Sequence, residues 1–165
     1  MLYPTQKIAI SLYQSLQKMT LQEQINFKRN LKILSEASQE CTQEVFIEYI
    51  NQTQDFSQYY IDLINDIHNK VGIEKFPTIL SVFEQLLSGE HVAVECTFAQ
   101  QPTLQIQHNI QSYIKKQFPN CKYVLLDINL EPSMILGYNI KIGDQVRHFS
   151  LKNSLELLAE RLAVA

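Results

Sequence analysis

The stretch FPTILSVFEQLLSGEHVAVECTF, residues 76–98, contains the point at which the hydrophobic period of this chain changes. Its first half places apolar residues three and four positions apart, which is the spacing of an amphipathic helix. From His91 onward apolar and polar residues alternate, as in a strand with one buried face. Ser88-Gly89-Glu90 lies between the two patterns, and Gly89 is suited to end a helix. We therefore expect a helical domain at 1–89 and a different domain at 90–165.

Upstream of this stretch, the helical period recurs four more times. Thr20 and Glu23 have the spacing of a capping box ahead of the second helix. Asp55 and Gly72 are suited to cap and end the fourth, and Pro77 is tolerated in the first turn of the fifth. The apolar residues that mark the five helices are Ile8, Ala9, Leu12 and Leu16; Leu21, Ile25, Leu31 and Leu34; Val45, Phe46, Tyr49 and Ile50; Phe56, Tyr59, Tyr60, Leu63, Ile64, Ile67 and Val71; and Phe76, Ile79, Leu80, Phe83, Leu86 and Leu87. Short connections between amphipathic helices predict a helical bundle.

Downstream, the strand period predominates. Strands are expected at 91–98, 123–130, 136–142 and 145–149, with one helix at 104–118. Gly143-Asp144 is a hairpin turn signal between the last two strands. Ser150 can cap a closing helix that carries Leu151, Leu155, Leu158 and Leu162. The predicted fold class is therefore α+β: an N-terminal helical bundle followed by a small C-terminal α/β unit of order β-α-β-β-β-α.

Composition limits the class of protein. With 165 residues and 45% hydrophobic content, the chain can bury a core. No apolar run approaches the ~20 residues that span a bilayer, and the N-terminus lacks a secretory signal pattern, so no direct membrane insertion is expected. Cys41, Cys96 and Cys121 lack the paired spacing of a zinc site or redox pair and are expected to be reduced thiols.

Charge and motifs argue against most binding chemistries. Residues 1–90 hold seven Lys and Arg against eleven Asp and Glu, and no basic stripe marks the sequence, so nucleic-acid binding is disfavoured. The four glycines form no phosphate loop. His68, His91, His108 and His148 have no metal-ligand spacing. We expect no catalytic residues, no metal, no cofactor and no small-molecule substrate.

One segment points to a family. Residues 129–150, NLEPSMILGYNIKIGDQVRHFS, followed by Leu155 and Leu158, resemble the C-terminal signature of the delta subunit of F-type ATP synthases, a family that includes the mitochondrial oligomycin-sensitivity-conferring protein. The chain departs from the family pattern at Leu136, where glycine is usual, and at His148, where aspartate is usual. The retained family residues of the turn and hairpin are Pro132, Ser133, Gly137, Gly143 and Ser150. Turn formation in any small α/β unit would also account for them.

The resemblance extends along nearly the whole chain. Ile8-Ala9 with Leu12 is similar to the family's first helix, and residues 76–86 are similar to its fifth. Membership would imply a non-catalytic stator subunit of the peripheral stalk. Such a subunit holds the N-terminal helices of the alpha subunits with its bundle and the C-terminus of the b subunit with its C-terminal unit. It is a peripheral protein at the cytoplasmic face of the bacterial inner membrane, or at the matrix side of the mitochondrial inner membrane.

The resemblance also implies where a partner would bind. The family holds the alpha-subunit helix in a groove between its first and fifth helices. The matching residues of this chain are Ile8, Ala9, Leu12, Ile79, Leu80 and Phe83. The other interpretation of these side chains is intramolecular core, because an amphipathic helix shows one apolar stripe in either case. Two other functions stay open: a free-standing adaptor or regulatory module of the same architecture, and a small enzyme with an unrecognised site.

Overall fold

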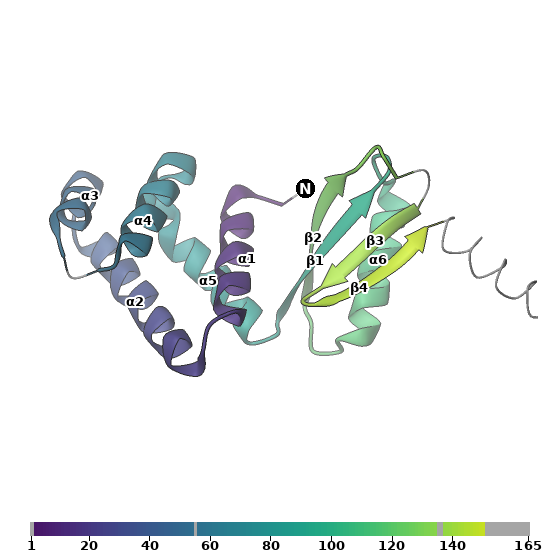
Figure 1. The fold of residues 1–165 in the computed structure, drawn as a ribbon, viewed down its shortest axis with the longest axis horizontal. Coiled ribbons are helices and arrows are strands. Elements are labelled where there is room, and N and C mark those ends of the chain that lie inside the picture. The colour runs from purple at the N-terminus through teal and green to yellow at the C-terminus, as the bar shows by residue number, and fades with distance from the viewer. Residues whose placement is uncertain (1, 55, 135–136, 151–165) are drawn as a thin grey trace, which may run out of the picture. The chain divides into compact units, whose positions relative to one another are not determined.

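A computed structural model describes residues 2–54, 56–134 and 137–150 of the chain, with only the backbone of Ser150. The chain divides into two compact units. The helical unit is Tyr3–Leu87, and the mixed unit contains the residues from Ser88 onward together with the first two residues. Figure 1 labels the elements of both units.

The helical unit contains the five predicted helices and one short 3₁₀ turn. The helices are α1 (Pro4–Gln17), α2 (Leu21–Glu40), α3 (Gln43–Gln52), α4 (Gln58–Val71) and α5 (Phe76–Leu87), and the turn η1 (Ile73–Lys75) joins the last two. The sequence did not predict η1. It follows Gly72, whose φ of 87° ends α4 as expected from a glycine at that position.

The capping box at the start of α2 is confirmed. The Thr20 amide and hydroxyl both donate to Glu23 Oε2 at 2.8 Å, and the Glu23 amide donates to Thr20 Oγ1 at 3.4 Å. These bonds satisfy amides that the first turn of a helix leaves without a partner. At the start of α1, the Tyr3 amide donates to the side-chain oxygen Oε1 of Gln6 at 3.0 Å. Asp55, the expected cap of α4, lies outside the described residues, and the prediction was wrong about the start of this helix: the N-cap residue is Ser57, and Phe56 precedes the helix.

The core of the helical unit consists of one face from each helix. The Phe27 and Phe83 rings meet edge to face with centroids 6.3 Å apart, which joins α2 to α5. The buried apolar side chains are Ala9, Ile10, Leu12, Leu16, Phe27, Leu31, Leu34, Phe46, Ile50, Ile64, Ile67, Ile73, Phe76, Ile79, Phe83 and Leu86. The period of three and four therefore identified most of the core.

Several apolar residues assigned to helix faces are not in this core. Leu21, Ile25, Val45 and Tyr49 are exposed, although the spacing predicted them on the buried sides of α2 and α3. The interpretation was wrong for α2 because Leu21 and Ile25 lie roughly 110–150° around the helix from the line through Phe27, Leu31 and Leu34.

The mixed unit contains four strands and one helix among its described residues, in the predicted order. They are β1 (His91–Phe98), α6 (Leu104–Gln117), β2 (Tyr123–Leu130), β3 (Gly137–Ile142) and β4 (Gln145–Ser150). The sheet order is β2-β1-β3-β4. β1 and β2 are parallel, and α6 is the crossover that parallel strands require; the other two pairings are antiparallel.

One face of this sheet packs against α6. Val94, Cys96 and Phe98 alternate along β1 and are buried, as the sequence predicted. They form a core with residues of α6, of the connection that follows it, of β2 and of β3, namely Ile110, Ile114, Cys121, Val124, Leu126 and Ile140. On the opposite face, the cross-strand pair Glu95 and Lys141 forms an ion pair with a nitrogen-oxygen distance of 3.5 Å.

The α+β fold class is thus confirmed. The expected closing helix after Ser150 lies outside the described residues, and Ser150 itself is the last residue of β4. The hairpin turn at Gly143-Asp144 is confirmed, since β3 pairs with β4 across these two residues. Gly143 has a φ of 56°, the positive value that a type II′ turn needs at its first central residue.

Candidate helix-binding groove

The helical unit carries an open groove between α1 and α4. Its volume is about 370 Å³. Its apolar side chains come from both helices, Ile8 and Leu12 from α1 and Tyr59 and Leu63 from α4. The remaining lining residues are Pro4, Lys7, Ser11, Asp66 and Lys70. A concave apolar surface with polar groups beside it has the composition of a helix-binding groove.

The sequence of α4 explains why this groove is left open. Two apolar doublets, Tyr59-Tyr60 and Leu63-Ile64, make the apolar stripe of α4 wider than one packing face needs. Ile64 is buried in the core, whereas Leu63 beside it lines the groove. These doublets could have predicted, from the sequence, that α4 contributes one side of the groove.

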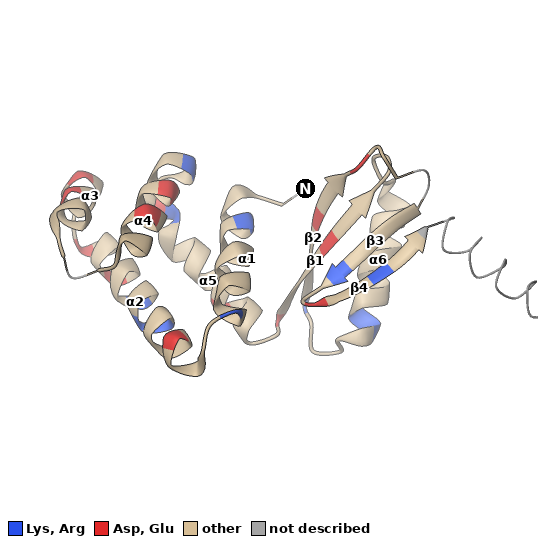
Figure 2. Cartoon of the chain, in the orientation of Figure 1, with Lys and Arg blue, Asp and Glu red and all other residues tan. Residues whose placement is uncertain are grey.

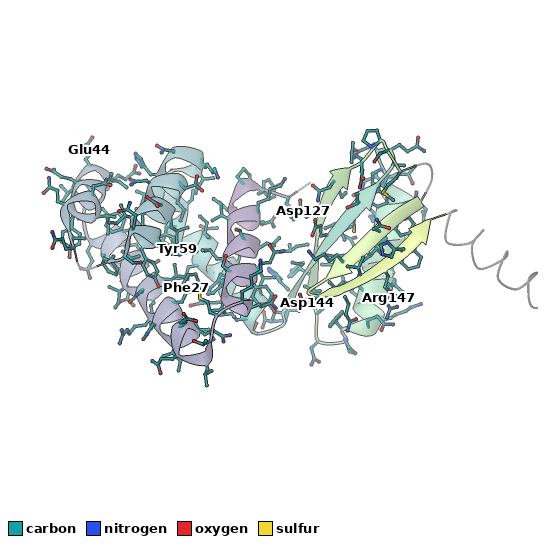
Figure 3. The ribbon with its side chains drawn as sticks, viewed as in Figure 1. Phe27, Glu44, Tyr59, Asp127, Asp144 and Arg147 are labelled. Carbon is teal, nitrogen blue, oxygen red and sulfur yellow. The ribbon has the colours of Figure 1, made fainter. Side chains whose placement is uncertain are left out.

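Tyr59 is held in place by three neighbours. Its ring centroid lies 6.0 Å from that of Phe27 and 5.4 Å from that of Tyr60, and Figure 3 shows Tyr59 beside Phe27. Burial raises the pKa of the Tyr59 phenol, a hydrogen bond with Ser15 opposes that shift, and the charge of Tyr60 adds to it. The side chain is still 44% exposed. It therefore presents a fixed, neutral ring with a polar tip to any segment in the groove.

Charged side chains border the groove. The ammonium of Lys70 lies 2.8 Å from the Asp66 carboxylate one helical turn away, and both side chains are exposed. Lys7 of α1 lines the same groove. Exposed charges of this kind contribute little affinity but influence orientation and the rate of association.

The residues that the family resemblance singled out for the groove have different positions. Ile8 and Leu12 line the α1–α4 groove, with Ile8 half-buried and Leu12 buried. Ala9 is buried in the bundle. On α5, Ile79 and Phe83 are buried and Leu80 is half-buried, and none of the three lines this groove. A partner-binding role for the residues of α5 stays a prediction.

The family turn and hairpin residues build backbone structure in the mixed unit. Pro132 and Ser133 lie in an exposed turn, where the Ser133 hydroxyl donates to Glu131 Oε1 at 2.8 Å. Gly137 has a φ of 105° and pairs with Ser150, and Gly143 forms the hairpin turn. Of the two departures from the family pattern, Leu136 lies outside the described residues.

The other departure, His148, contacts a neighbouring strand. Its Nδ1 lies 2.8 Å from Oδ1 of Asn139, its cross-strand partner. On the α6 side of the same hairpin, a cleft of about 80 Å³ lies next to Tyr113 and Arg147. The Arg147 guanidinium stacks over the Tyr113 ring at 5.7 Å and donates to its hydroxyl. This cleft is too small for a helix.

The described part of the chain contains neither a metal-binding cluster nor a membrane-spanning helix. Within it, no three His, Cys, Asp or Glu side chains gather in a way that could hold a metal ion. No described helix combines the length and apolar character needed to cross a membrane.

Comparisons with known proteins agree with the resemblance noted in the sequence. The model of the family "ATP synthase delta (OSCP) subunit" matches residues 6–162. The ATP synthase subunits delta of Acinetobacter baumannii strains AYE and SDF are each 26% identical to this chain, with 83% of this chain and 84% of the relative covered. A chain of the Toxoplasma gondii mitochondrial ATP synthase hexamer aligns over 98% of both chains at 14% identity, but its TM-score of 0.40 supports no inference. From the extent of the family match, the chain belongs to the ATP synthase delta (OSCP) subunit family.

Proposed function

We propose that this chain is a non-catalytic stator subunit whose α1–α4 groove holds a helix of the catalytic head. As a family member, the chain is a peripheral-stalk subunit of a membrane-associated ATP synthase complex. The observation that supports helix binding is the groove itself, which has apolar side chains from two helices and charged side chains beside them. The predicted occupant is the N-terminal helix of an alpha subunit.

The groove lies between a different pair of helices from the pair expected from the resemblance, which was the first and the fifth. α1 contributes as expected, through Ile8 and Leu12, but its partner across the groove is α4. The side chains of Ile79 and Phe83 on α5 are buried inside the bundle. Tyr59 and Leu63 are therefore added to the proposed contact residues, and the α5 residues are proposed as its support.

The mixed unit is proposed to hold the C-terminus of the stalk's b subunit. Two exposed apolar side chains on β4, Val146 and Phe149, offer contacts beyond the α6 core. β4 is also an edge strand of the described sheet, so its outer backbone groups are available for pairing. In this proposal the two predicted domains, 1–89 and 90–165, bind different subunits. The complex lies at the cytoplasmic face of a bacterial inner membrane, or at the matrix side if the protein is mitochondrial.

The groove is tested by calorimetric titration of the purified full chain with a helical peptide from the N-terminus of its own alpha subunit. Ile8→Ser and Leu63→Ser are expected to weaken binding by about tenfold or more, because each removes an apolar contact from the groove. Ile33→Ser is the matched control, since Ile33 is exposed on α2 and does not line the groove. Urea unfolding of each variant separates lost binding from lost stability.

A wild-type chain that releases no heat with a soluble, helical peptide at high micromolar concentration would contradict the proposal. Equal weakening by Ile33→Ser would also contradict it. Turnover of ATP by the isolated chain would show that it is an enzyme in its own right. A free-standing adaptor is not favoured, because the family match covers nearly the whole chain.

A further inference from the structure

One flank of α2 combines exposed apolar side chains with cations. Leu21, Ile25, Lys28, Arg29 and Lys32 are spaced i, i+4, i+7, i+8 and i+11, so they lie along one side of the helix. We call these five residues the α2 stripe. Leu21 is 75% exposed and Ile25 is 52% exposed. Figure 2 shows the cations in blue along α2.

The cations of the α2 stripe have no partner within the described residues. Lys28, Arg29 and Lys32 form neither ion pairs nor hydrogen bonds there. Glu23, the one acid in the first half of the helix, is bonded to Thr20. Glu36 lies one turn beyond Lys32 and is exposed, but no ion pair joins them. Among the described residues, no ion pair within α2 therefore engages the cations of the stripe.

The charges of the helical unit are segregated along its sequence. Residues 1–32 contain five Lys and Arg and one Glu, whereas residues 33–69 contain seven Asp and Glu and neither Lys nor Arg. Figure 2 shows the acidic side in red along α3. An acidic segment would therefore be attracted to the basic side and repelled by the acidic side. This difference restricts where on the bundle such a segment can bind.

We propose that the α2 stripe binds an acidic amphipathic helix from another subunit of the same complex. Its apolar residues would contact Leu21 and Ile25, and its carboxylates would pair with Lys28, Arg29 and Lys32. The stripe spans about 16 Å, because eleven residues rise about 1.5 Å each, and this equals about three turns of a partner helix. The site is distinct from the α1–α4 groove, since no stripe residue lines that groove.

A protein partner fits the stripe better than a membrane surface. A helix that lies in a membrane interface uses a broad apolar face, usually with Trp or Phe. The broad face of α2 is already buried in the bundle through Phe27, Leu31 and Leu34. Only a flank with two aliphatic side chains is left, which matches the narrow seam between two helices. The inference rests on the proposed function only in placing the chain within an ATP synthase complex.

The test uses the assembled complex, purified with this chain in place. A photoreactive p-benzoylphenylalanine replaces Ile25 in one preparation and Leu21 in a second; both positions are exposed, so the fold should tolerate the change. Irradiation is expected to join each position to one segment of another subunit, and mass spectrometry should show that this segment is rich in Asp and Glu with a helical apolar period. Adding Arg29→Glu and Lys32→Glu should lower the yield of cross-linked product by about tenfold, and high salt should lower it as well.

The matched control is Lys115→Glu with Lys116→Glu on α6. This pair makes the same change in net charge on exposed positions outside the stripe and should leave the yield unchanged. If the chain co-purifies with the complex but the product is a lipid adduct, a non-acidic segment or nothing, the inference is overturned and the stalk role stands. If the chain does not co-purify with the complex, both are overturned.

Discussion

At the scale of single residues, the three cysteines differ by environment. Cys96 is fully buried in the mixed unit, and burial raises the pKa of its thiol to about 12, with smaller contributions from the charges of Asp127 and Glu95. The folded state therefore favours the protonated thiol. The stability that this contributes is fully present below the ordinary thiol pKa of about 9 and is lost as pH rises towards 12. Cys41, by contrast, is exposed.

This difference predicts the order in which the thiols react. At pH 8 a thiol reagent such as a chromogenic disulfide should modify Cys41 rapidly, because only an exposed thiol can form an accessible thiolate. Cys96 and Cys121 are both buried and should react only as fast as the protein unfolds. The measurement is the number of thiols modified over time with and without denaturant. Fast modification of Cys41→Ser protein in its native state would show that the buried thiols are accessible.

The effect of substituting Phe83 shows whether this residue belongs to the core or to a binding surface. Its ring is buried against Phe27, so Phe83→Ala should lower the free energy of unfolding by about 3–5 kcal/mol. Ile33→Ala, on the exposed side of α2, should change it by less than about 0.5 kcal/mol. Urea titration followed by circular dichroism gives both values. A Phe83→Ala protein of unchanged stability that no longer bound the alpha-subunit peptide would make Phe83 a contact residue instead.

Residue identity alone indicated which side chains are apolar but not which are covered. Ile79 and Phe83 are equally consistent with a core or a partner surface, because both environments select the same side chains. Leu21 and Ile25 were predicted on a packing face and are exposed. Only the neighbouring helices determine which of these alternatives holds.

At the scale of elements, Gly72 controls the junction between α4 and η1. Its φ of 87° is one that side-chain-bearing residues rarely adopt. A β-carbon there would also contact the carboxylate of Glu74. That carboxylate accepts a hydrogen bond of 2.8 Å from the Gln43 side chain of α3. The glycine thus allows both the turn and the contact between η1 and α3.

Gly72→Ala should therefore destabilise the helical unit by the backbone cost of about 1–2 kcal/mol, plus a smaller cost for moving the flexible, exposed Glu74 carboxylate away from its bond with Gln43. Two controls separate the contributions in thermal or urea unfolding. Gly89 has a similar φ of 76°, and a β-carbon added there would meet open space. Gly89→Ala should therefore show only the backbone cost. Adding Glu74→Ala to Gly72→Ala should recover the part that is due to the clash. Equal losses for Gly72→Ala and Gly89→Ala would exclude a contribution from Glu74.

Helix and strand boundaries were predictable because they depend on local signals. The capping box at Thr20, the glycine that ends α4 and the turn at Gly143 each satisfy backbone requirements within a few residues. η1 was missed because a single 3₁₀ turn between two helices has no period of its own. The pairing of β1 with both β2 and β3 was not predictable, since strand order depends on contacts distant in sequence.

At the scale of the whole molecule, the two units should be separable. Every buried side chain in the core of the helical unit comes from α1 to α5 and η1. We expect residues 1–89 alone to fold with a single cooperative urea transition and the helical circular dichroism signal of the unit. A fragment that shows no cooperative transition would contradict the predicted boundary. The same fragment, if folded, should bind the alpha-subunit peptide as well as the full chain does.

The element order, the change from helical to strand period near Gly89 and the α+β class all follow from the amino-acid sequence, because hydrophobic period and turn residues act over short distances. Its resemblance to the delta family also indicated the stalk role. The packing of the helices, by contrast, places the open groove between α1 and α4, buries Ile79 and Phe83 of α5, and leaves the α2 stripe uncovered. The physical reason is that a period records which side of a helix is apolar, whereas the packing of the other helices decides what covers that side.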